Sequence, residues 1–344
     1  MSKVLKADTF FSQSRNRLIV DVRSPSEYLQ GHIPGAVSLP LFDDCERAEI
    51  GTLYKQVSRE AAVRRGLEMV APRMAGYIDT IKDISSESIV FMYCWRGGMR
   101  SGFMSNLFSL FSYEVYLLEG GYKSYRNEVL TSMMKPYSLR VISGYTGSRK
   151  TEILQSLRNH GEYIIDLEYL AKHKGSAFGH LGMKEQGSCE QFENDLHDAL
   201  KAVEGSKNIW LEDESRSIGK VHLPQEFFKQ MQSAPCVFID VNFDERVDYL
   251  LEFYGKQGVE ALADSAVKTS KRMGPQHVKH ALELLQAGET RAFIAEMLKY
   301  YDKTYLHSFS RRTHTEEKKL EVSGKSVNEI CSILIREYGI GTRL

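Results

Sequence analysis

The sequence predicts an α/β protein of two domains, residues 1–134 and 135–344, each built on a parallel sheet. Two apolar runs, Ile89–Tyr93 and Leu139–Ser143, are typical of buried strands, and each leads through a glycine-containing turn into a helical pattern. Further strands in the second half end in charged residues, as in parallel sheets whose site lies at one edge. Pro136 follows a helical pattern and marks the boundary between the domains.

The composition is that of an ordinary globular protein. Of 344 residues, 42% are hydrophobic and 26% are charged, and the formal net charge is zero. Any nucleic-acid site must therefore be a local patch of charge. The five cysteines show no CxxC spacing, which argues against a disulfide framework or a zinc knuckle and favours a reducing compartment. Because we find no signal-peptide pattern and no run of transmembrane length, we expect a cytoplasmic protein without a membrane partner.

The N-terminal domain starts with an apolar strand, Leu18–Arg23, that ends in an acid and a base. A helix start at Ser24–Tyr28 and a rigid turn at Gly31–Ala36 follow. Asp21 and Arg23 have two interpretations. They form a solvated pair that contributes little, or they brace a neighbouring loop at the carboxyl edge of a parallel sheet.

The stretch Cys94–Ser101 organises this domain. Cys94 sits in the turn between the strand that ends at Tyr93 and a helix whose apolar positions begin at Met104. Backbone N–H groups of the turn, the positive end of the helix and two arginines would all favour a thiolate. Two glycines let the backbone curl around the sulfur. Free cysteine is more often a small buried hydrophobic residue, but this context favours a reactive site.

Two other segments belong to the first domain. A second strand, Glu114–Leu118, runs into the basic, aromatic segment Gly120–Arg126, which we expect to close the domain. The segment Ile50–Gln56 precedes several arginines and is either a solvated helix face or a contact for a phosphate backbone. The sequence leaves both interpretations of it open.

The second domain opens with a Walker A pattern, Gly144–Thr151, between a strand and a helical stretch, Glu152–Asn159. Such a loop is an anion nest at a helix N-terminus, with Lys150 on the phosphates and Thr151 on a Mg²⁺ ion. The glycine expected before the lysine is Arg149, which either crowds the phosphates or adds a cation to a diphosphate. We expect an ordinary negative φ at Arg149, so that the added charge dominates. The predicted diphosphate-binding residues are Gly144, Thr146, Gly147, Ser148, Arg149, Lys150 and Thr151.

Acidic residues follow two further strand patterns, 162–168 and 208–211, where a parallel sheet would deliver them to the same site. His173 and His180 lack a familiar metal-ligand spacing, so loop contacts are favoured and no protein-bound metal centre is expected there. The second set of site residues predicted in this domain is Asp166, Glu168, His173, Asp213, Glu214 and Arg216.

The chain after Arg246 is expected to be mostly helical to its end. Between Lys268 and His280 it carries four cations, two histidines and no acid. This run is either a solvated face or a contact for a nucleic-acid backbone. The candidate nucleic-acid-binding cations are Lys268, Lys271, Arg272 and Lys279.

Several of these motifs resemble known families. The Asp-Val-Arg strand end, the segment Gly31–Ala36 and the Cys-x5-Arg loop resemble the rhodanese family of sulfurtransferases, in which the cysteine carries sulfur as a persulfide. A rhodanese-like domain followed by a P-loop domain resembles, over nearly the whole chain, the bacterial tRNA 2-selenouridine synthase family. By position the resemblance assigns Cys94 as the catalytic residue. It also implies that six further residues bind the selenium or support the loop that holds it: Asp21, Arg23, Arg96, Gly97, Gly98 and Arg100.

The resemblance also implies an activity. Its substrate is the wobble 2-thiouridine of certain tRNAs, and its co-substrates are geranyl diphosphate and selenophosphate. A geranyl group is first transferred to the sulfur, and the S-geranyl group is then replaced by selenium. On this reading the P-loop holds a diphosphate ester, and Cys94 takes selenium from selenophosphate and presents it to C2 of the base.

Two other classes remain open at this stage. The first is a rhodanese-type sulfurtransferase coupled to a nucleotide-dependent P-loop kinase or ATPase. The second is a non-catalytic module whose rhodanese half is a scaffold. The intact cysteine loop argues against a scaffold, which has no use for a reactive cysteine.

Overall fold

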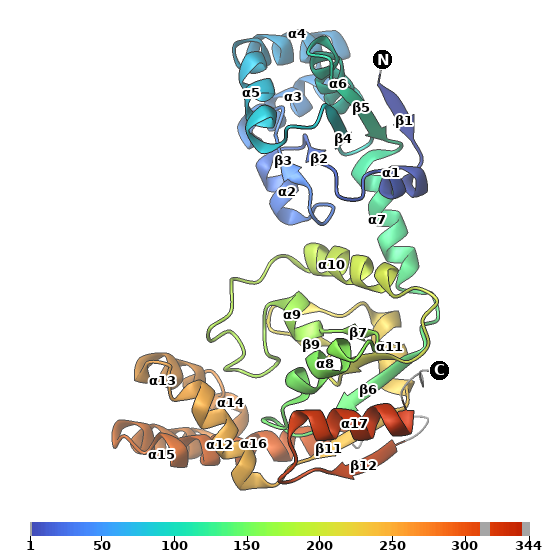
Figure 1. Ribbon diagram of the computed structural model, residues 1–344. Helices are drawn as coiled ribbons and strands as arrows, with labels where there is room; N and C mark the ends of the chain where they lie inside the picture. Colours follow the sequence, from blue (N-terminus) through green and yellow to red (C-terminus); the bar gives the residue numbers. More distant parts are fainter. Residues whose placement is uncertain (1, 310–316, 339–344) are drawn as a thin grey trace. The chain divides into compact units, whose positions relative to one another are not determined.

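The computed structural model describes residues 2–309 and 317–338 (Figure 1). The chain forms two compact units, Met1–Ser132 with Glu193–Asp195, and Met133–Phe192 with Leu196–Leu344. The predicted boundary after residue 134 lies two residues beyond Ser132, where the N-terminal stretch of the first unit ends. Within the described ranges, no helix is both long and apolar enough to cross a membrane.

The first unit is built on a five-stranded sheet in the order β1-β5-β4-β2-β3, and every strand pair in it is parallel. This arrangement confirms the predicted α/β class. Its elements are β1 (Lys3–Leu5), α1 (Ala7–Gln13), β2 (Ile19–Asp21), α2 (Pro25–Gln30), β3 (Val37–Ser38), α3 (Asp44–Gln56), α4 (Arg59–Val70), η1 (Ala71–Arg73), α5 (Met74–Ile84), β4 (Ile89–Tyr93), α6 (Met99–Leu110), β5 (Glu114–Leu118) and α7 (Gly121–Ser132).

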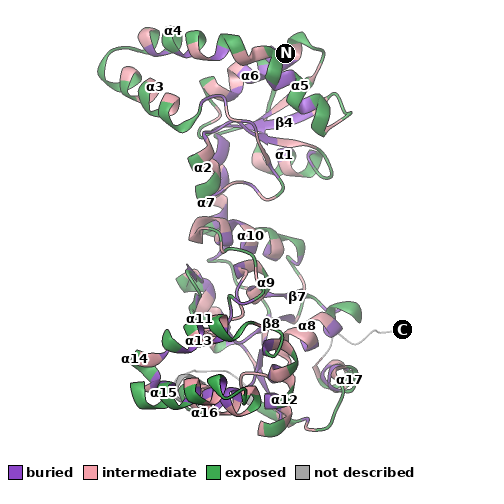
Figure 2. Ribbon diagram, turned by 90° about the vertical axis from the view of Figure 1, so that its left-hand side faces the viewer, coloured by how far each residue is buried: buried purple, intermediate pink, exposed green. Residues whose placement is uncertain are grey.

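The central strand β4 is apolar along its whole length because side chains cover both of its faces. Val90 and Met92 belong to a core that includes residues of α5 and α6. The intervening Phe91 meets Phe10 of α1 edge to face, with ring centroids 5.2 Å apart. Figure 2 shows β4 as a buried element. The carboxyl end of this rigid strand is where the cysteine loop begins.

The second unit contains a parallel sheet in the order β12-β11-β6-β8-β7 and a two-stranded antiparallel ribbon, β9 with β10. Its elements are β6 (Leu139–Ser143), α8 (Lys150–Asn159), β7 (Ile164–Ile165), α9 (Leu167–Ala171), α10 (Cys189–Ala202), β8 (Ile209–Glu212), β9 (Ser217–Ile218), β10 (Val221–His222), α11 (Gln225–Ser233), β11 (Cys236–Asp240), α12 (Phe243–Tyr254), α13 (Val259–Val267), α14 (Ser270–Met273), α15 (Pro275–Gln286), α16 (Thr290–Phe309), β12 (Glu317–Glu321) and α17 (Val327–Tyr338).

Two cores stabilise this unit. Helices α8 and α17 pack on the sheet through residues such as Leu154 and Leu334, which join Ile142 and Ile239 of the central strands. Helices α12 to α16 form a second core with Phe178, as the predicted helical region requires. The expectation that the chain after Arg246 is mostly helical is confirmed for the described residues, and the strand β12, which the sequence did not single out, pairs along its whole length with β11. This edge strand is polar, with Leu320 packed against the core, so its sequence carries little of the apolar signal of a strand.

Candidate functional site

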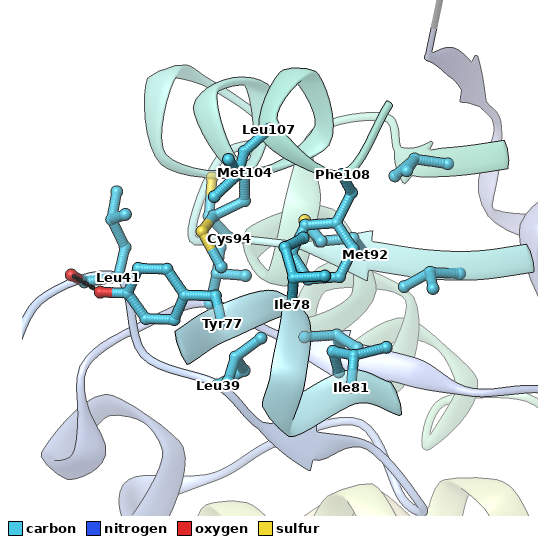
Figure 3. Close-up of a cluster of buried hydrophobic side chains, with 14 of the residues drawn as sticks. Leu39, Leu41, Tyr77, Ile78, Ile81, Met92, Cys94, Met104, Leu107 and Phe108 are labelled. Atoms are coloured by element: carbon cyan, nitrogen blue, oxygen red, sulfur yellow. Dashed lines mark hydrogen bonds between the residues drawn. The ribbon is translucent and has the colours of Figure 1, made fainter. Parts of the chain in front are cut away.

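Cys94 lies where β4 ends, in the loop that leads to α6. Its Sγ accepts hydrogen bonds from the Gly98 N–H at 3.3 Å and from the Ser101 hydroxyl at 3.2 Å. Figure 3 shows Cys94 among the core side chains of this unit, and the residue is only 3% exposed. The loop therefore directs one backbone donor and one side-chain donor at the cysteine sulfur.

Glycines are required where the loop meets the start of α7. Gly97 has φ +64°, and a Cβ there would lie 2.8 Å from the carbonyl oxygen of Leu118. A Cβ at Gly121 would lie 2.3 Å from the carbonyl oxygen of Cys94. This close approach lets the Tyr122 N–H donate to that same carbonyl at 2.8 Å. The backbone around the sulfur is therefore fixed from two sides.

Arg100 is held by a carboxylate that the sequence did not single out. Its guanidinium donates to both Glu27 oxygens, at 2.5 and 3.1 Å. Burial alone would raise the pKa of Glu27, but Arg100 and the Ser24 N–H lower it below its ordinary value. Glu27 also completes the capping box of α2 with Ser24. Arg100 is thereby positioned at the loop, whereas Arg96 is exposed beside it.

Asp21 and Arg23 form a buried pair, so their interpretation as a solvated pair is wrong. Arg23 Nη2 lies 2.6 Å from Asp21 Oδ2 and 2.6 Å from the carbonyl oxygen of Gly31. The guanidinium carbon also lies 3.7 Å from the centroid of the Tyr122 ring. Since the N–H of Tyr122 bonds to Cys94, this arrangement supports the cysteine loop indirectly. Asp21 and Arg23 do not line the cavity beside Cys94.

In the second unit, the predicted anion loop lies between β6 and α8. Lys150 Nζ donates to the carbonyl oxygen of Gly144 at 2.9 Å, which holds it across the loop. The Gly144 N–H donates to the hydroxyl of Tyr305, a residue 161 positions later in the chain. A Cβ at Gly144 would lie 2.7 Å from the carbonyl oxygen of Ile239, so the loop requires glycine there. The helix begins at Lys150, two residues earlier than the predicted Glu152.

The expected negative φ at Arg149 is wrong. Arg149 is the N-cap of α8 with φ +60° and ψ +27°, in the left-handed region that glycine adopts more easily. Its guanidinium Nε donates to Glu152 Oε2 at 2.8 Å, and its guanidinium carbon lies over the Tyr249 ring, 5.6 Å from the centroid. At Arg149 the loop therefore has the left-handed backbone conformation that is usual for glycine, and the Arg149 side chain is bonded to Glu152 of α8.

This conformation predicts an unusual order of stabilities. The Arg149→Gly variant is expected to be more stable than Arg149→Ala by about 1 kcal/mol, because only the alanine carries a Cβ in the left-handed region. At Lys279, an exposed position within α15, glycine should instead be less stable than alanine by about 1 kcal/mol. Thermal and denaturant unfolding of the four variants measures both differences. The same order at both positions would contradict the left-handed assignment.

Carboxylates gather beside the anion loop. Thr151 donates to Glu168 Oε2 at 2.9 Å, and the Glu168 N–H donates to Glu212 Oε1 at 2.7 Å. Asp213 Oδ2 accepts from the hydroxyls of Ser143 and Tyr305 at 2.7 and 2.8 Å. The expected strand 162–168 is shorter than predicted, because Asp166 ends it and its side chain caps α9. Glu212, at the end of β8, was missing from the predicted set.

Burial sets the charge of this cluster. It raises the pKa of Glu214 to about 8, with the nearby Glu168 acting in the same direction and Lys150 opposing both. Burial also raises the pKa of Glu212 well above its usual range and raises that of Glu168. Near neutral pH the Glu214 carboxyl is therefore mostly protonated, which lets the cluster hold a proton.

The raised pKa of Glu214 makes stability depend on pH. Its contribution is fully present below the unfolded value near 4.5 and is lost as pH rises through about 8. The Glu214→Gln variant cannot titrate there, so its free energy of unfolding should fall less over this range. The difference in slope is expected to be at most about 1.4 kcal/mol per pH unit. Denaturant unfolding between pH 5 and 9 measures it, with exposed Glu226→Gln as the control, and parallel profiles for Glu214→Gln and the parent would contradict the assignment.

His173 and Arg216 lie on a neighbouring cavity of about 1060 Å³, together with His180. His173 is buried, and burial followed by the proximity of His180 lowers its pKa. Within the described ranges there is no group of three or more His, Cys, Asp or Glu side chains arranged to hold a metal ion. Arg216 is exposed and does not line the cavity at the anion loop.

The anion loop opens onto a cavity of about 760 Å³. Three of the four candidate nucleic-acid-binding cations, Lys268, Lys271 and Arg272, line it, whereas Lys279 does not. Lys279 is exposed on α15 and lies 4.0 Å from Glu283. Aromatic side chains form much of the remaining wall: Tyr249, Phe253, Tyr254, Tyr300, Tyr301 and Tyr305. The cavity thus combines an anion-binding loop, cations and apolar surface.

The chain matches two family models in the order of its two units. Residues 8–128 match the rhodanese-like domain, and residues 137–333 match the tRNA 2-selenouridine synthase AAA domain. The chain belongs to the tRNA 2-selenouridine synthase family.

Relatives that bear the name tRNA 2-selenouridine synthase agree with this membership. The protein of Nitrosomonas europaea is 38% identical over 248 residues, which cover 69% of this chain and 63% of that protein. For Bdellovibrio bacteriovorus the identity is 38% over 253 residues, covering 70% and 65%. For Shewanella frigidimarina it is 32% over 333 residues, covering 86% and 90%. The first two alignments thus span slightly less than two thirds of their relatives.

In this member of the tRNA 2-selenouridine synthase family, several contacts were not predicted from the sequence. Ser101 donates a hydrogen bond to the cysteine sulfur, Glu27 accepts hydrogen bonds from Arg100, and the Tyr305 hydroxyl accepts one from Gly144 of the anion loop. Ser101 had a signal, because it lies in the first turn of the helix that follows Cys94. Glu27 and Tyr305 had none, since each is brought to its partner by the fold over a long separation in sequence.

Proposed function

We propose that this chain converts 2-thiouridine at the wobble position of tRNA to 2-selenouridine in two transfers. The first moves a geranyl group from geranyl diphosphate to the sulfur, and the second replaces the S-geranyl group with selenium from selenophosphate. The observation that carries the proposal is the presence, in one chain of this family, of an anion loop on an aromatic cavity and a cysteine sulfur held by two donors.

The first transfer suits the cavity of the second unit. The sulfur on C2 attacks C1 of geranyl diphosphate, the C1–O bond breaks, and diphosphate leaves with the electron pair. The N3 proton of the base is released in the same overall step. Lys150 and the N–H groups at the start of α8 stabilise the charge of the departing diphosphate. The aromatic wall accommodates the geranyl chain.

A Mg²⁺ ion fits beside this loop. Magnesium is usually held by one or two protein oxygens together with phosphate oxygens and water, and the Thr151 hydroxyl and Glu168 carboxyl lie 2.9 Å apart there. Thr151 and Glu168 would hold the ion, which would neutralise charge on the diphosphate. Lys268, Lys271 and Arg272, which line the same cavity, contact phosphate groups of the substrates.

The second transfer belongs to the Cys94 loop. Alkylation converts the thiocarbonyl into a thioether, so that geranylthiol can leave C2. The Cys94 thiolate attacks C2, the bond from C2 to the geranyl-bearing sulfur breaks, and geranylthiol departs with a proton. The selenium of selenophosphate then attacks C2 and releases the Cys94 thiolate. Water finally cleaves the Se–P bond, which gives 2-selenouridine and phosphate.

Electron counting supports this role for Cys94. Selenophosphate carries selenium in its fully reduced state. A direct S–Se bond between Cys94 and selenium, as in a persulfide carrier, would require the loss of two electrons from the sulfur–selenium pair. Only reduction of the phosphorus of selenophosphate could take up these electrons. Attack of the thiolate on C2 needs no oxidant. The hydrogen bonds from Gly98 and Ser101 favour the thiolate in both its attack and its release.

Mass spectrometry of bulk tRNA nucleosides tests the proposal. Cells that lack the gene should lose 2-selenouridine and S-geranyl-2-thiouridine, retain 2-thiouridine, and recover both modified nucleosides when the gene is restored. An unchanged nucleoside profile, together with ATP turnover by the purified chain, would instead support a sulfurtransferase coupled to a nucleotide-dependent kinase.

A further inference from the structure

A further cavity, of about 550 Å³, lies beside Cys94 in the first unit. One wall is the cysteine loop and the start of α6, and the other is the helix pair α3 and α4. Cys94 forms part of its floor together with buried residues such as Ala62 and Val70. A volume of this size is typical of a small-molecule site.

The lining of this cavity is apolar to an unusual degree for solvent-accessible surface. Five large hydrophobic side chains that line it are between 37% and 50% exposed: Tyr54, Val63, Leu67, Trp95 and Met99. Such side chains are normally scattered singly over the surface of a soluble protein, and their concentration around one hollow marks a binding site. The segment 50–56, whose role the sequence left open, supplies part of this wall through α3.

Charge is confined to part of the lining. Arg47 and Arg100 are both directed at Glu27, whereas Lys55 and Arg96 are exposed. These cations suit a phosphate group, but they do not explain the apolar wall. Selenophosphate is small and anionic, so it would leave most of that wall facing water.

We propose that this cavity binds the geranyl chain of the S-geranylated base, which places C2 beside the sulfur of Cys94 and retains geranylthiol as it leaves. The inference rests on the proposed function and names the group that the Cys94 site recognises. A ten-carbon chain suits a largely apolar cavity whose lining also includes a nucleophile. It also explains why selenation would require prior geranylation, because a base without the chain would lack the contact that brings C2 to Cys94.

Tryptophan fluorescence tests the cavity without any turnover. The chain has two tryptophans, and Trp210 is fully buried in the core of the second unit, so an emission change on adding geranylthiol reports on Trp95. Titration under reducing conditions should give a saturable change in the parent protein. Leu67→Asp should need at least about tenfold more geranylthiol, whereas Leu110→Asp, at a more exposed leucine outside the cavity, should behave as the parent.

A second measurement uses the full chain with selenophosphate and tRNA carrying either S-geranyl- or S-methyl-2-thiouridine. The parent should have a KM at least about tenfold lower for the S-geranyl tRNA, and Leu67→Asp should lose that preference. Equal KM values in the parent, or a Leu67→Asp variant that responds to geranylthiol as the parent does, would overturn the cavity assignment. A Trp95 response without selenation of either tRNA would support the cavity assignment and remove the proposed function.

Discussion

Replacing Cys94 with alanine is expected to abolish 2-selenouridine formation while S-geranyl-2-thiouridine accumulates. The variant removes the nucleophile of the second transfer and leaves the anion loop of the second unit intact. Loss of a nucleophile that acts with positioned donors lowers turnover by about 10⁴-fold or more. Selenation should therefore fall below detection, whereas geranylation should proceed at the rate of the parent protein.

The control for this result is Cys45→Ala. Cys45 is an exposed free cysteine in α3 of the same unit, and it does not line the cavity beside Cys94. It should support normal levels of both modified nucleosides. Cys94→Ser keeps a smaller polar group at the buried position and should match Cys94→Ala if the thiolate itself is required. Normal levels of 2-selenouridine in either Cys94 variant would contradict the role of Cys94 as the nucleophile of the second transfer.

Lys150→Ala is expected to remove both modified nucleosides, because geranylation precedes selenation. Lys150 lies across the anion loop on the carbonyl oxygen of Gly144, from which its ammonium group can move to a bound diphosphate. Loss of one preorganised charge of this kind costs about 100-fold or more in rate. The measurement is the conversion of 2-thiouridine tRNA by the purified variant with geranyl diphosphate.

Selenation of tRNA that already carries S-geranyl-2-thiouridine should survive in Lys150→Ala, since that step uses the Cys94 loop. Lys229→Ala, an exposed lysine of α11 that pairs with Glu226, serves as the matched control and should geranylate normally. A Lys150→Ala protein that geranylates at the rate of the parent and fails at selenation would show that the two steps had been assigned to the wrong units.

The sequence predicted those parts of the site that depend on local order along the chain. The loops at Cys94 and Lys150 each follow a short apolar strand and precede a helix, and the structure places both as expected. Parallel strands bring such loops to one edge of a sheet. The positions of Glu168 and Asp213 after two strand patterns were therefore enough to predict that both lie near the anion loop. These features are encoded within a few residues of one another.

Other features depend on how distant segments close on each other. The positive φ of Arg149, in the loop between β6 and α8, is a further feature that the sequence did not reveal, because an arginine gives no signal of the left-handed conformation that glycine adopts more easily. The contact of Tyr305 with Gly144 joins residues 161 positions apart. The apolar wall beside Cys94 arises from exposed positions of α3 and α4, such as Tyr54 and Leu67. In the sequence these residues are indistinguishable from ordinary members of amphipathic helices.

Stepwise reconstitution with the purified full chain tests the central claim most directly. Transfer RNA carrying 2-thiouridine is incubated first with geranyl diphosphate alone and then with selenophosphate, and its nucleosides are analysed by mass spectrometry after each addition. The account predicts S-geranyl-2-thiouridine after the first addition, and 2-selenouridine with free geranylthiol after the second. Formation of 2-selenouridine from selenophosphate without geranyl diphosphate would contradict it.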